Sequence, residues 1–395
     1  MRLTFDADVE AFRDEFVAFL DEHLPDEAVT AQRSRSTADI PDWARLWQRA
    51  MFDHGWLLPG NPPEFGGRNA TILQQYVHRD ELSKRRIYQS FNPQGLGIIA
   101  ASLLSFGTDE QKQRWAIPIL RAEITAALGM SEPGAGSDLA SLRTSAVAGT
   151  DADGDHFVVN GQKVWTSGAH HADVILTFVR TDPDAPKHKG ISVLVIPTDT
   201  PGVVRRPFAS ICGLDDLDFN EVFFTDVRVP AENLVGPLNG GWGVANGSLG
   251  HERTLLWLSY ADWLEQLIND FTPVTPQDRD RYATLVMDTY ALRALGSIAL
   301  SREARDEQDV PALSVLKLFG SEAFQDAVGY ALEAAGTDGL AHPASTAPFA
   351  PFGEDATSTS WFERYARSFG GTIAGGTSEI QRGIIAQRIL GLPRA

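Results

Sequence analysis

Hydrophobic residues near the start of the chain follow a helical period. They recur at the spacing of one helix face, with acidic residues between them: Val9, Phe12, Phe16, Phe19 and Leu20. Helical periodicity resumes in residues 72–82 and 109–112, after a loop predicted at the Pro- and Gly-rich residues 59–67. We therefore expect a helical N-terminal third.

The pattern changes from about residue 124. Short β-branched and aromatic runs, bounded by Pro, Gly and Asp, predict strands at residues 173–179, 191–196 and 221–224. Two dipeptides, Asp153-Gly154 and Asn160-Gly161, are typical of tight hairpin turns. Beyond residue 240 long helical patterns return, as in residues 281–300. The predicted order is helices, a β module, then helices.

Composition narrows the classes of function. The chain has 395 residues, too many for one small core, and 43% hydrophobic residues. Its net charge of −18 argues against binding to nucleic acids or membrane surfaces. The single Cys212 excludes an internal disulfide and fits a reducing compartment. No apolar stretch approaches the ~20 residues of a membrane span, and the acidic N-terminus does not resemble a signal peptide. We expect a soluble, cytoplasmic protein without membrane insertion.

Three motifs carry the chemistry. Residues 131–138 (SEPGAGSD) form a Gly-rich turn that lets backbone N–H groups approach an electron-rich ligand. Residues 163–167 (KVWTS) contain Trp165, which can supply a flat wall for an aromatic ring or pack in the core of the β module. Residues 375–382 (GGTSEIQR) form the third motif.

In this order, the three motifs closely resemble those of the acyl-CoA dehydrogenase family of flavoenzymes, and the resemblance covers nearly the whole chain. It implies an α+β fold: an N-terminal helical domain (1–123), a small central β-barrel or sandwich domain (124–236) and a C-terminal four-helix bundle (237–395). It also implies that FAD binds between the β domain and the bundle.

The resemblance assigns the cofactor contacts. Leu128, Met130 and Ser131 are expected along the flavin ring, and Ser137 is expected near the flavin or the acyl thioester. Trp165 and Ser167 are expected to contact the isoalloxazine ring, and Thr377 and Glu379 the adenosine part of FAD.

Catalysis in this family needs a base that removes a weakly acidic proton next to a thioester carbonyl, and a carboxylate in an apolar slot suits this task. In much of the family the base is a Glu directly before the Gly-Thr-Ser of the last motif. Gly375 stands there instead, where we expect it to line the substrate site. A minority of the family carries the base on a bundle helix, in a Glu-Arg dipeptide. Glu252-Arg253 matches it, with Glu252 as base and Arg253 contacting CoA.

Several of these residues could instead have ordinary structural roles. A Glu on a helix is most often a surface acid, and Arg253 could be a solvated salt-bridge partner. His170 and His171 are paired but lack neighbouring ligands at metal spacing, so we expect no metal site. The basic run Lys187-His188-Lys189 is either a solvated turn or a phosphate contact.

The resemblance also bears on assembly. Homotetrameric members of the family carry two sequence segments that contact the FAD pyrophosphate of a neighbouring subunit. The first segment is missing from this chain at residues 271–276. The second is only partly matched at residues 333–339, where Glu333 stands in place of a Gln. An acid near a pyrophosphate is electrostatically unfavourable. The chain also resembles actinobacterial members acting on steroid or other bulky side chains, many of which are α2β2 heterotetramers. We expect such a heterotetramer or a homo-oligomer.

The expected function is therefore α,β-dehydrogenation of an acyl-CoA in fatty-acid or steroid side-chain β-oxidation, with electrons passed to an acceptor such as electron-transfer flavoprotein. Two alternatives remain: an oxidase or carrier-protein-linked dehydrogenase on the same scaffold, and a non-catalytic subunit of a heteromer. The identity of the acyl chain is left open, because hydrophobic pockets discriminate weakly per methylene.

Overall fold

The computed structural model describes residues 5–26, 36–85, 87, 89–212, 217–307, 310–340 and 360–393. At residues 248–254, 270 and 310 it describes the helical backbone and not the side chains. The described chain forms two compact units. The bundle unit comprises Met1–Glu22, Asn69–Tyr88 and Arg253–Ala395; the sheet unit comprises His23–Arg68 and Gln89–Glu252.

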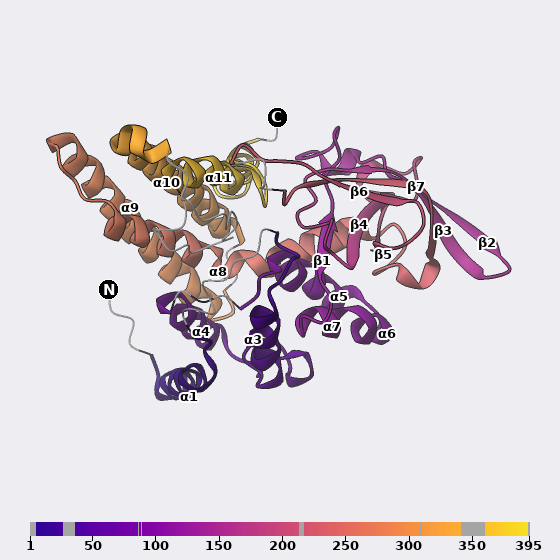
Figure 1. Ribbon diagram of the computed structural model, residues 1–395, viewed down its shortest axis with the longest axis horizontal. Helices are drawn as coiled ribbons and strands as arrows, with labels where there is room; N and C mark the ends of the chain where they lie inside the picture. The colour runs from indigo at the N-terminus through magenta and orange to yellow at the C-terminus, as the bar shows by residue number, and fades with distance from the viewer. Residues whose placement is uncertain are drawn as a thin grey trace. The chain divides into compact units, whose positions relative to one another are not determined.

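The bundle unit is built from helices (Figure 1). The long helix α8 begins in the sheet unit, and the boundary between the units falls inside it. The others are α1 (Ala7–His23), α4 (Ile72–Lys84), α9 (Pro276–Glu303), α10 (Val310–Ala335), α11 (Trp361–Ile373), α12 (Ser378–Arg388) and the short η7 (Gly336–Leu340), with α8 spanning Gly241–Asp270.

Capping and one-sided burial explain these helices. Capping boxes begin α4 at Thr71, α9 at Thr275 and α11 at Ser360, where the cap side chain and the third helical residue satisfy each other's free N–H groups. The apolar face predicted for α1 is buried as expected. In the bundle core, α8 contributes Trp257 and Leu264, which pack with Leu292 of α9.

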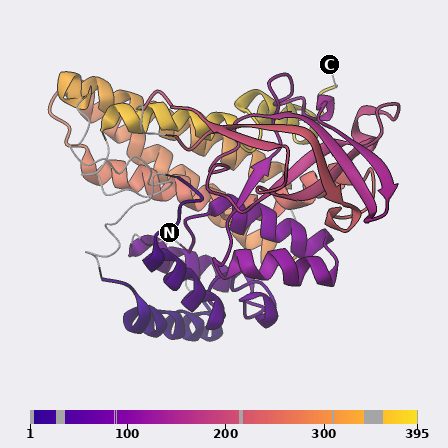
Figure 2. The same cartoon turned by 45° about the vertical axis from the view of Figure 1, so that its right-hand side comes forward.

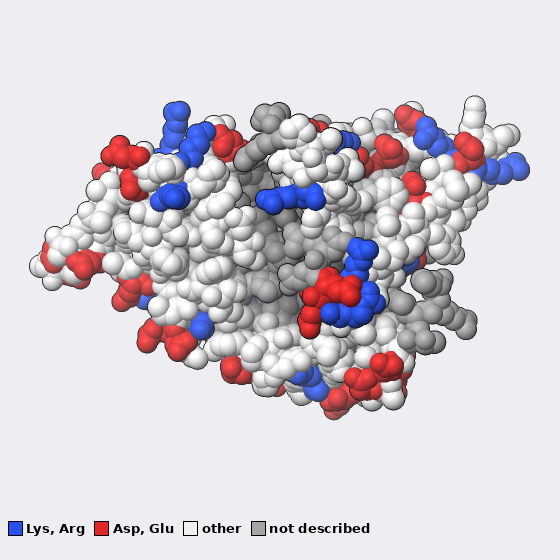
Figure 3. Space-filling view, turned by 180° about the vertical axis from the view of Figure 1, so that it is seen from behind, with Lys and Arg blue, Asp and Glu red and all other residues white. Residues whose placement is uncertain are grey.

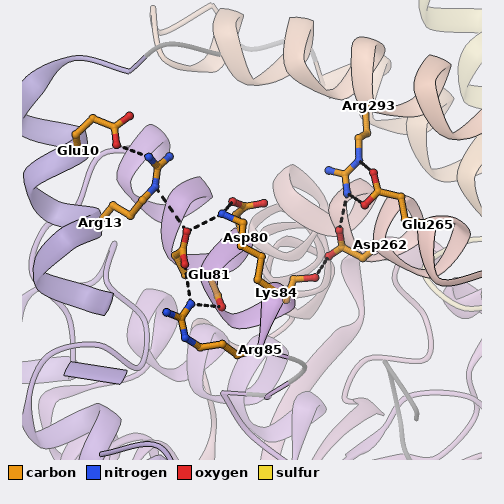
Figure 4. A network of polar contacts seen from close by, with 10 residues as sticks. Glu10, Arg13, Asp80, Glu81, Lys84, Arg85, Asp262, Glu265 and Arg293 are labelled. Carbon is orange, nitrogen blue, oxygen red and sulfur yellow. Dashed lines mark hydrogen bonds and ion pairs between the residues drawn. The ribbon is translucent and has the colours of Figure 1, made fainter. Parts of the chain in front are cut away.

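Ion pairs join helices within the bundle unit (Figure 4). On α4, Glu81 lies 2.7 Å from both Lys84 and Arg85 and 3.7 Å from Arg13 of α1. A second group joins α8 to α9, where Asp262 lies 3.0 Å from Arg293, and Asp262 also accepts a 2.5 Å hydrogen bond from Ser83 of α4. Burial raises the pKa of Asp262 against these favourable contacts.

The sheet unit begins with α3 (Asp42–Asp53) and the turn η1 (Pro63–Phe65). Two further helices each contain a π-helical stretch, η2 (Gly95–Ala100) leading into α5 (Ala101–Phe106), and η3 (Lys112–Ala116) between α6 (Asp109–Gln111) and α7 (Ile117–Leu120). Gln111 anchors the second helix by donating hydrogen bonds to the Glu232 and Leu234 carbonyl oxygens, at 2.7 and 2.8 Å.

Seven strands form one curled sheet in the order β1-β4-β2-β3-β7-β6, with β5 also paired to β4 (Figures 1 and 2). The predicted strands are confirmed as β4, β5 and part of β7. The bounds are β1 (Ala126–Gly129), β2 (Ser145–Asp151), β3 (Gly154–Lys163), β4 (Val174–Arg180), β5 (Ile191–Pro197), β6 (Val203–Pro207) and β7 (Asn220–Pro230); short 3₁₀ turns are η4 (Leu139–Ser141), η5 (Lys187–Lys189) and η6 (Ala231–Asn233).

One predicted hairpin is confirmed and the other is wrong. Asp151 pairs with Gly154, so β2 and β3 form the tight hairpin expected at Asp153-Gly154. Asn160-Gly161 instead forms a bulge inside β3, where the register against β7 shifts between Val159 and Gly161. Gly161 has φ +151°, and a Cβ there would lie 2.6 Å from the Thr144 Cα. The Asn160-Gly161 dipeptide therefore allows a bulge within β3 and does not form a turn at the end of a strand.

The predicted fold class is confirmed: N-terminal helices, a central sheet and a C-terminal helical bundle. The core of the sheet unit gathers inward side chains of several strands, among them Val159, Ile175, Ile196 and Val227, each fully buried. Within the described residues, no helix combines the length and apolarity needed to cross a bilayer.

Candidate functional site

The first two motifs lie against each other in the sheet unit. The turn 131–138 follows β1, and the second motif continues from the end of β3. The Val164 N–H donates a 3.0 Å hydrogen bond to the Ser131 carbonyl oxygen. Lys163 Nζ donates to the Met130 carbonyl oxygen at 3.2 Å. Leu128, Met130 and Ser131 therefore lie on the segment that the second motif contacts directly.

A buried ion pair joins these segments. Lys163 Nζ lies 2.8 Å from Glu132 Oε1, and the Lys163 side chain has no exposed surface. Burial lowers the pKa of Lys163 to about 8, against the opposing attraction of Glu132. Burial raises the pKa of Glu132, but the Lys163 charge and the hydrogen bonds that Glu132 accepts outweigh it and lower that pKa below its usual value. Both groups are charged at neutral pH.

Trp165 is exposed rather than packed in the core. Its φ of +60° turns the chain sharply after β3, and 59% of its surface is accessible. Phe208 and Phe219 hold the ring edge-on at centroid distances of 5.2 and 5.5 Å. The indole therefore has two aromatic supports and accessible surface left for a planar ligand.

Hydroxyl groups lie beside this indole in sequence. Ser167 is 9% exposed, and the fully buried Thr166 has an Oγ1 with no hydrogen-bond partner among the described residues. Because Thr166 is fully buried, a ligand lying on the indole would reach the Ser167 hydroxyl rather than that of Thr166. An exposed aromatic wall followed by a serine hydroxyl fits the isoalloxazine ring of FAD.

The far part of the Gly-rich turn is open. Ser137 is exposed, and a Cβ added at Gly134 or Gly136 would meet no atom within 4 Å. The turn is tied at Asp138, whose carboxylate lies 3.1 Å from Lys187 Nζ. Lys187 belongs to the exposed basic turn η5, and its neighbour His188 packs edge-on against Trp242 at 4.3 Å.

The paired histidines have an ordinary structural setting. Asn220 Nδ2 lies 3.0 Å from His170 Nδ1, within hydrogen-bond distance. Burial, followed by the neighbouring His171, lowers the pKa of His170. Across the described residues, no three His, Cys, Asp or Glu side chains are grouped to hold a metal ion.

The C-terminal motif forms the start of α12 in the bundle unit. Gly375 and Gly376 have φ of +67° and +96°, a conformation that favours glycine. Their carbonyl oxygens are bound by Gln381 Nε2 at 3.1 Å and by Lys317 Nζ at 2.8 Å, respectively. The Thr377 hydroxyl caps α12 by accepting from the Ile380 N–H at 3.3 Å.

Other residues of this motif differ in exposure. Glu379 is exposed at the first turn of α12, where its own backbone N–H and then the Thr377 hydroxyl lower its pKa. Ser378 Oγ and Gln381 Oε1 are buried without a hydrogen-bond partner among the described residues. Unsatisfied polar atoms therefore flank the predicted adenosine contacts, which fits a polar ligand at this end of α12.

Glu252 and Arg253 lie within α8, as the resemblance implies. Their side chains lie outside the described residues, so their contacts stay predictions. The segment that lacks the family's interface motif is a short capped connection from α8 to α9: the Thr275 hydroxyl accepts from the Asp278 N–H at 3.1 Å. The segment at Glu333 ends α10 and continues into η7.

Comparison with known proteins agrees with this layout. Models of the acyl-CoA dehydrogenase N-terminal, middle and C-terminal domains match residues 6–123, 127–227 and 239–390. The chain is 33% identical to acyl-CoA dehydrogenase IpdE1 of Mycobacterium tuberculosis over 399 aligned positions, covering 98% of each chain. It is 34% identical to acyl-CoA dehydrogenase FadE26 of the same organism, covering 86% of each.

Solved structures show the same similarity. One titled "Tcur3481-Tcur3483 steroid ACAD" is 30% identical, with a TM-score of 0.76 and complete coverage of both chains. The ChsE4-ChsE5 complex from Mycobacterium tuberculosis is 29% identical, with a TM-score of 0.78 and complete coverage. Members of this family are FAD-dependent oxidoreductases that act on CH–CH groups. The chain belongs to the acyl-CoA dehydrogenase family.

Proposed function

We propose that this chain dehydrogenates an acyl-CoA thioester between Cα and Cβ, with Glu252 removing the α-proton. The assignment of Glu252 as the base rests on the absence of a carboxylate side chain at position 375, where the residue is glycine. This position has a φ of +67° and no side chain, so the start of α12 offers no carboxylate where much of the family has one. The Glu-Arg dipeptide on α8 then becomes the candidate, with Arg253 contacting the CoA portion.

Other residues bind and orient. Trp165, supported by two phenylalanines, provides a wall for the isoalloxazine ring, and Ser167 offers a hydroxyl group to its polar edge. Leu128, Met130 and Ser131 line the same ring from the β1 side. When bound, FAD supplies the acceptor for the β-hydride. Ser137 is placed near the flavin or the thioester, Gly375 lines the substrate site, and Thr377 and Glu379 bind the adenosine.

The base assignment is tested by Glu252→Gln. Positioned proton transfer contributes ~100-fold or more to a rate, so we expect flavin bleaching by acyl-CoA to slow by at least that factor while FAD stays bound. Glu265→Gln, on the same helix, is the matched control and should bleach at the normal rate. Normal bleaching by Glu252→Gln would refute the assignment.

The electron acceptor separates the closest alternatives. We propose an external acceptor such as electron-transfer flavoprotein. Reoxidation of the reduced enzyme by dioxygen at a catalytic rate would identify an oxidase, and bleaching only by carrier-protein thioesters would identify a carrier-linked enzyme. A chain that binds FAD but bleaches with no thioester would be a non-catalytic subunit.

The solved relatives suggest the substrate and the assembly. The first of the two structures above is titled a steroid ACAD, and the titles of both name two different chains. We propose a bulky, steroid-type acyl group and an α2β2 assembly with a related chain. A bleaching panel of short, branched, long and steroid-type CoA esters tests the first point. Fastest bleaching by a straight-chain ester would contradict it.

A further inference from the structure

The Glu132–Lys163 pair lies next to the proposed flavin contacts but has no part in the proposed chemistry. Lys163 is 0% exposed and Glu132 9%. Removing two charges from water costs free energy, and such pairs are often no more stabilising than well-packed apolar residues. Stability alone therefore does not explain why this ion pair is buried beside the proposed flavin contacts.

The contacts of Glu132 suggest one. Its Oε1 accepts from Lys163 Nζ and from the Thr144 N–H, both at 2.8 Å. Its Oε2 accepts from the Arg143 N–H at 2.7 Å. One carboxylate thus joins the Gly-rich turn to the end of β3 and to the residues that lead into β2. Charge-assisted hydrogen bonds of this kind are roughly twice as strong as neutral ones.

The contacts of Lys163 complete the link. Its ammonium group also donates to the Met130 carbonyl oxygen at 3.2 Å, and the adjacent Val164 N–H bonds the Ser131 carbonyl oxygen at 3.0 Å. Residues 130–132 and 163–164 are therefore joined by three separate interactions. These are the segments that carry Met130 and Ser131 on one side and Trp165 on the other.

We propose that Glu132 and Lys163 are positioning residues that fix the spacing between the Met130–Ser131 segment and Trp165, and thereby hold the isoalloxazine ring. The proposal rests on the flavin contacts assigned under the proposed function. It concerns the affinity and environment of FAD, not the proton transfer.

The pair should also make FAD binding depend on pH. Two charged groups act on Lys163: Glu132, which raises its pKa, and Arg180 of β4, which lowers it. Burial lowers the pKa of Lys163 to about 8. Above that pH the amine becomes neutral and loses its attraction for Glu132, so FAD affinity should fall as pH rises through about 8.

The first experiment is calorimetric titration of the apoprotein with FAD at pH 7, with Glu132→Gln and Lys163→Met beside the wild type. We expect the Kd for FAD to rise ~tenfold or more in both variants, and the visible flavin spectrum to shift. The control is Ile196→Ala in β5, which destabilises the same unit without touching the turn and should keep the wild-type Kd. Wild-type Kd and spectrum in a folded Glu132→Gln protein would overturn the proposal.

The second experiment needs no variant to fold. The Kd of the wild type for FAD is measured from pH 6.5 to 9.5, and we expect it to rise around pH 8. A flat profile would overturn the proposal. Neither readout depends on turnover: a wrong base assignment would appear as normal bleaching in Glu252→Gln with unchanged FAD affinity, whereas a wrong positioning role would appear only in these titrations.

Discussion

At the residue scale, buried polar side chains tie loops to the sheet. Asn92, 4% exposed, illustrates this. Its Nδ2 donates to the carbonyl oxygens of Thr37 and Ala126 at 2.9 and 3.0 Å, and its Oδ1 accepts from the Ala126 N–H at 3.0 Å. One amide thus connects the segment before α3, the segment before η2 and the start of β1.

We predict that Asn92→Ala destabilises the protein by ~3 kcal/mol, because three buried backbone groups lose their partner. Urea unfolding measures the change. Asn160→Ala is the matched control, since Asn160 makes two similar bonds with Asp226 at an exposed position, and it should cost below ~1 kcal/mol. Equal losses in both variants would contradict the assigned importance of burial.

Single residues also show what a sequence can predict. Motif residues such as Trp165 and Ser131 could be placed together because their segments carry recognisable local chemistry. The partners of Glu132 and Asn92 could not, because they come from positions remote in sequence and meet only in the folded sheet unit. Local sequence marks Lys163 only as the first residue of its motif, at the end of β3.

At the element scale, the start of α9 is fixed by one carboxylate. Asp278 Oδ2 accepts from the Val274 and Thr275 N–H groups at 3.0 and 2.6 Å, and Oδ1 accepts from the Tyr330 hydroxyl of α10. The Thr275 N–H, followed by the Tyr330 hydroxyl, lowers the pKa of Asp278 to about 2.

We predict that the advantage of wild type over Asp278→Asn depends on pH. The folded pKa lies below the ordinary value of 3.8, so the ionised cap stabilises fully above about pH 4 and loses this effect as pH falls toward 2. The difference in Tm between the two proteins should shrink from pH 6 to pH 3. A pH-independent difference for Asp278→Asn would refute the cap.

Elements differ in how well local sequence predicts them. The face of α1 follows from its hydrophobic period, and the strands β4 and β5 follow from β-branched and aromatic runs bounded by Pro, Gly and Asp. The bulge at Gly161 does not, because an Asn-Gly pair suits a hairpin turn and a bulge equally, and the close approach of Thr144 decides between them. The π-helical stretches in η2 and η3 likewise leave no distinct period in the sequence.

At the scale of the whole molecule, acidic residues outnumber basic ones, 52 to 34. The net charge is −18, and on the face seen in Figure 3 acidic and basic side chains lie in small separate groups among uncharged surface. Anionic ligands such as FAD and CoA must then meet local donors rather than a general positive field. In the proposed heteromeric assembly, the partner chain would supply further cations to these ligands.

We predict that the chain purified alone holds less than one FAD per subunit, and that co-purification with its partner restores full occupancy. Absorbance at the flavin and protein bands gives the ratio. Glu333→Gln tests the alternative, because removing an acid should raise FAD retention only if this chain packs against its own copies. Full occupancy in the lone wild-type chain would refute the heteromer.

The exposure of Trp165 has an optical consequence. Of the nine tryptophans, whose side chains all lie in the described part of the chain, Trp165 alone is exposed. Its indole should therefore emit at longer wavelength than the others, and a flavin stacked upon it should extinguish that red-edge emission first. If FAD stacks on Trp165 as proposed, this indole is an intrinsic fluorophore that reports binding and release of the ring without any label.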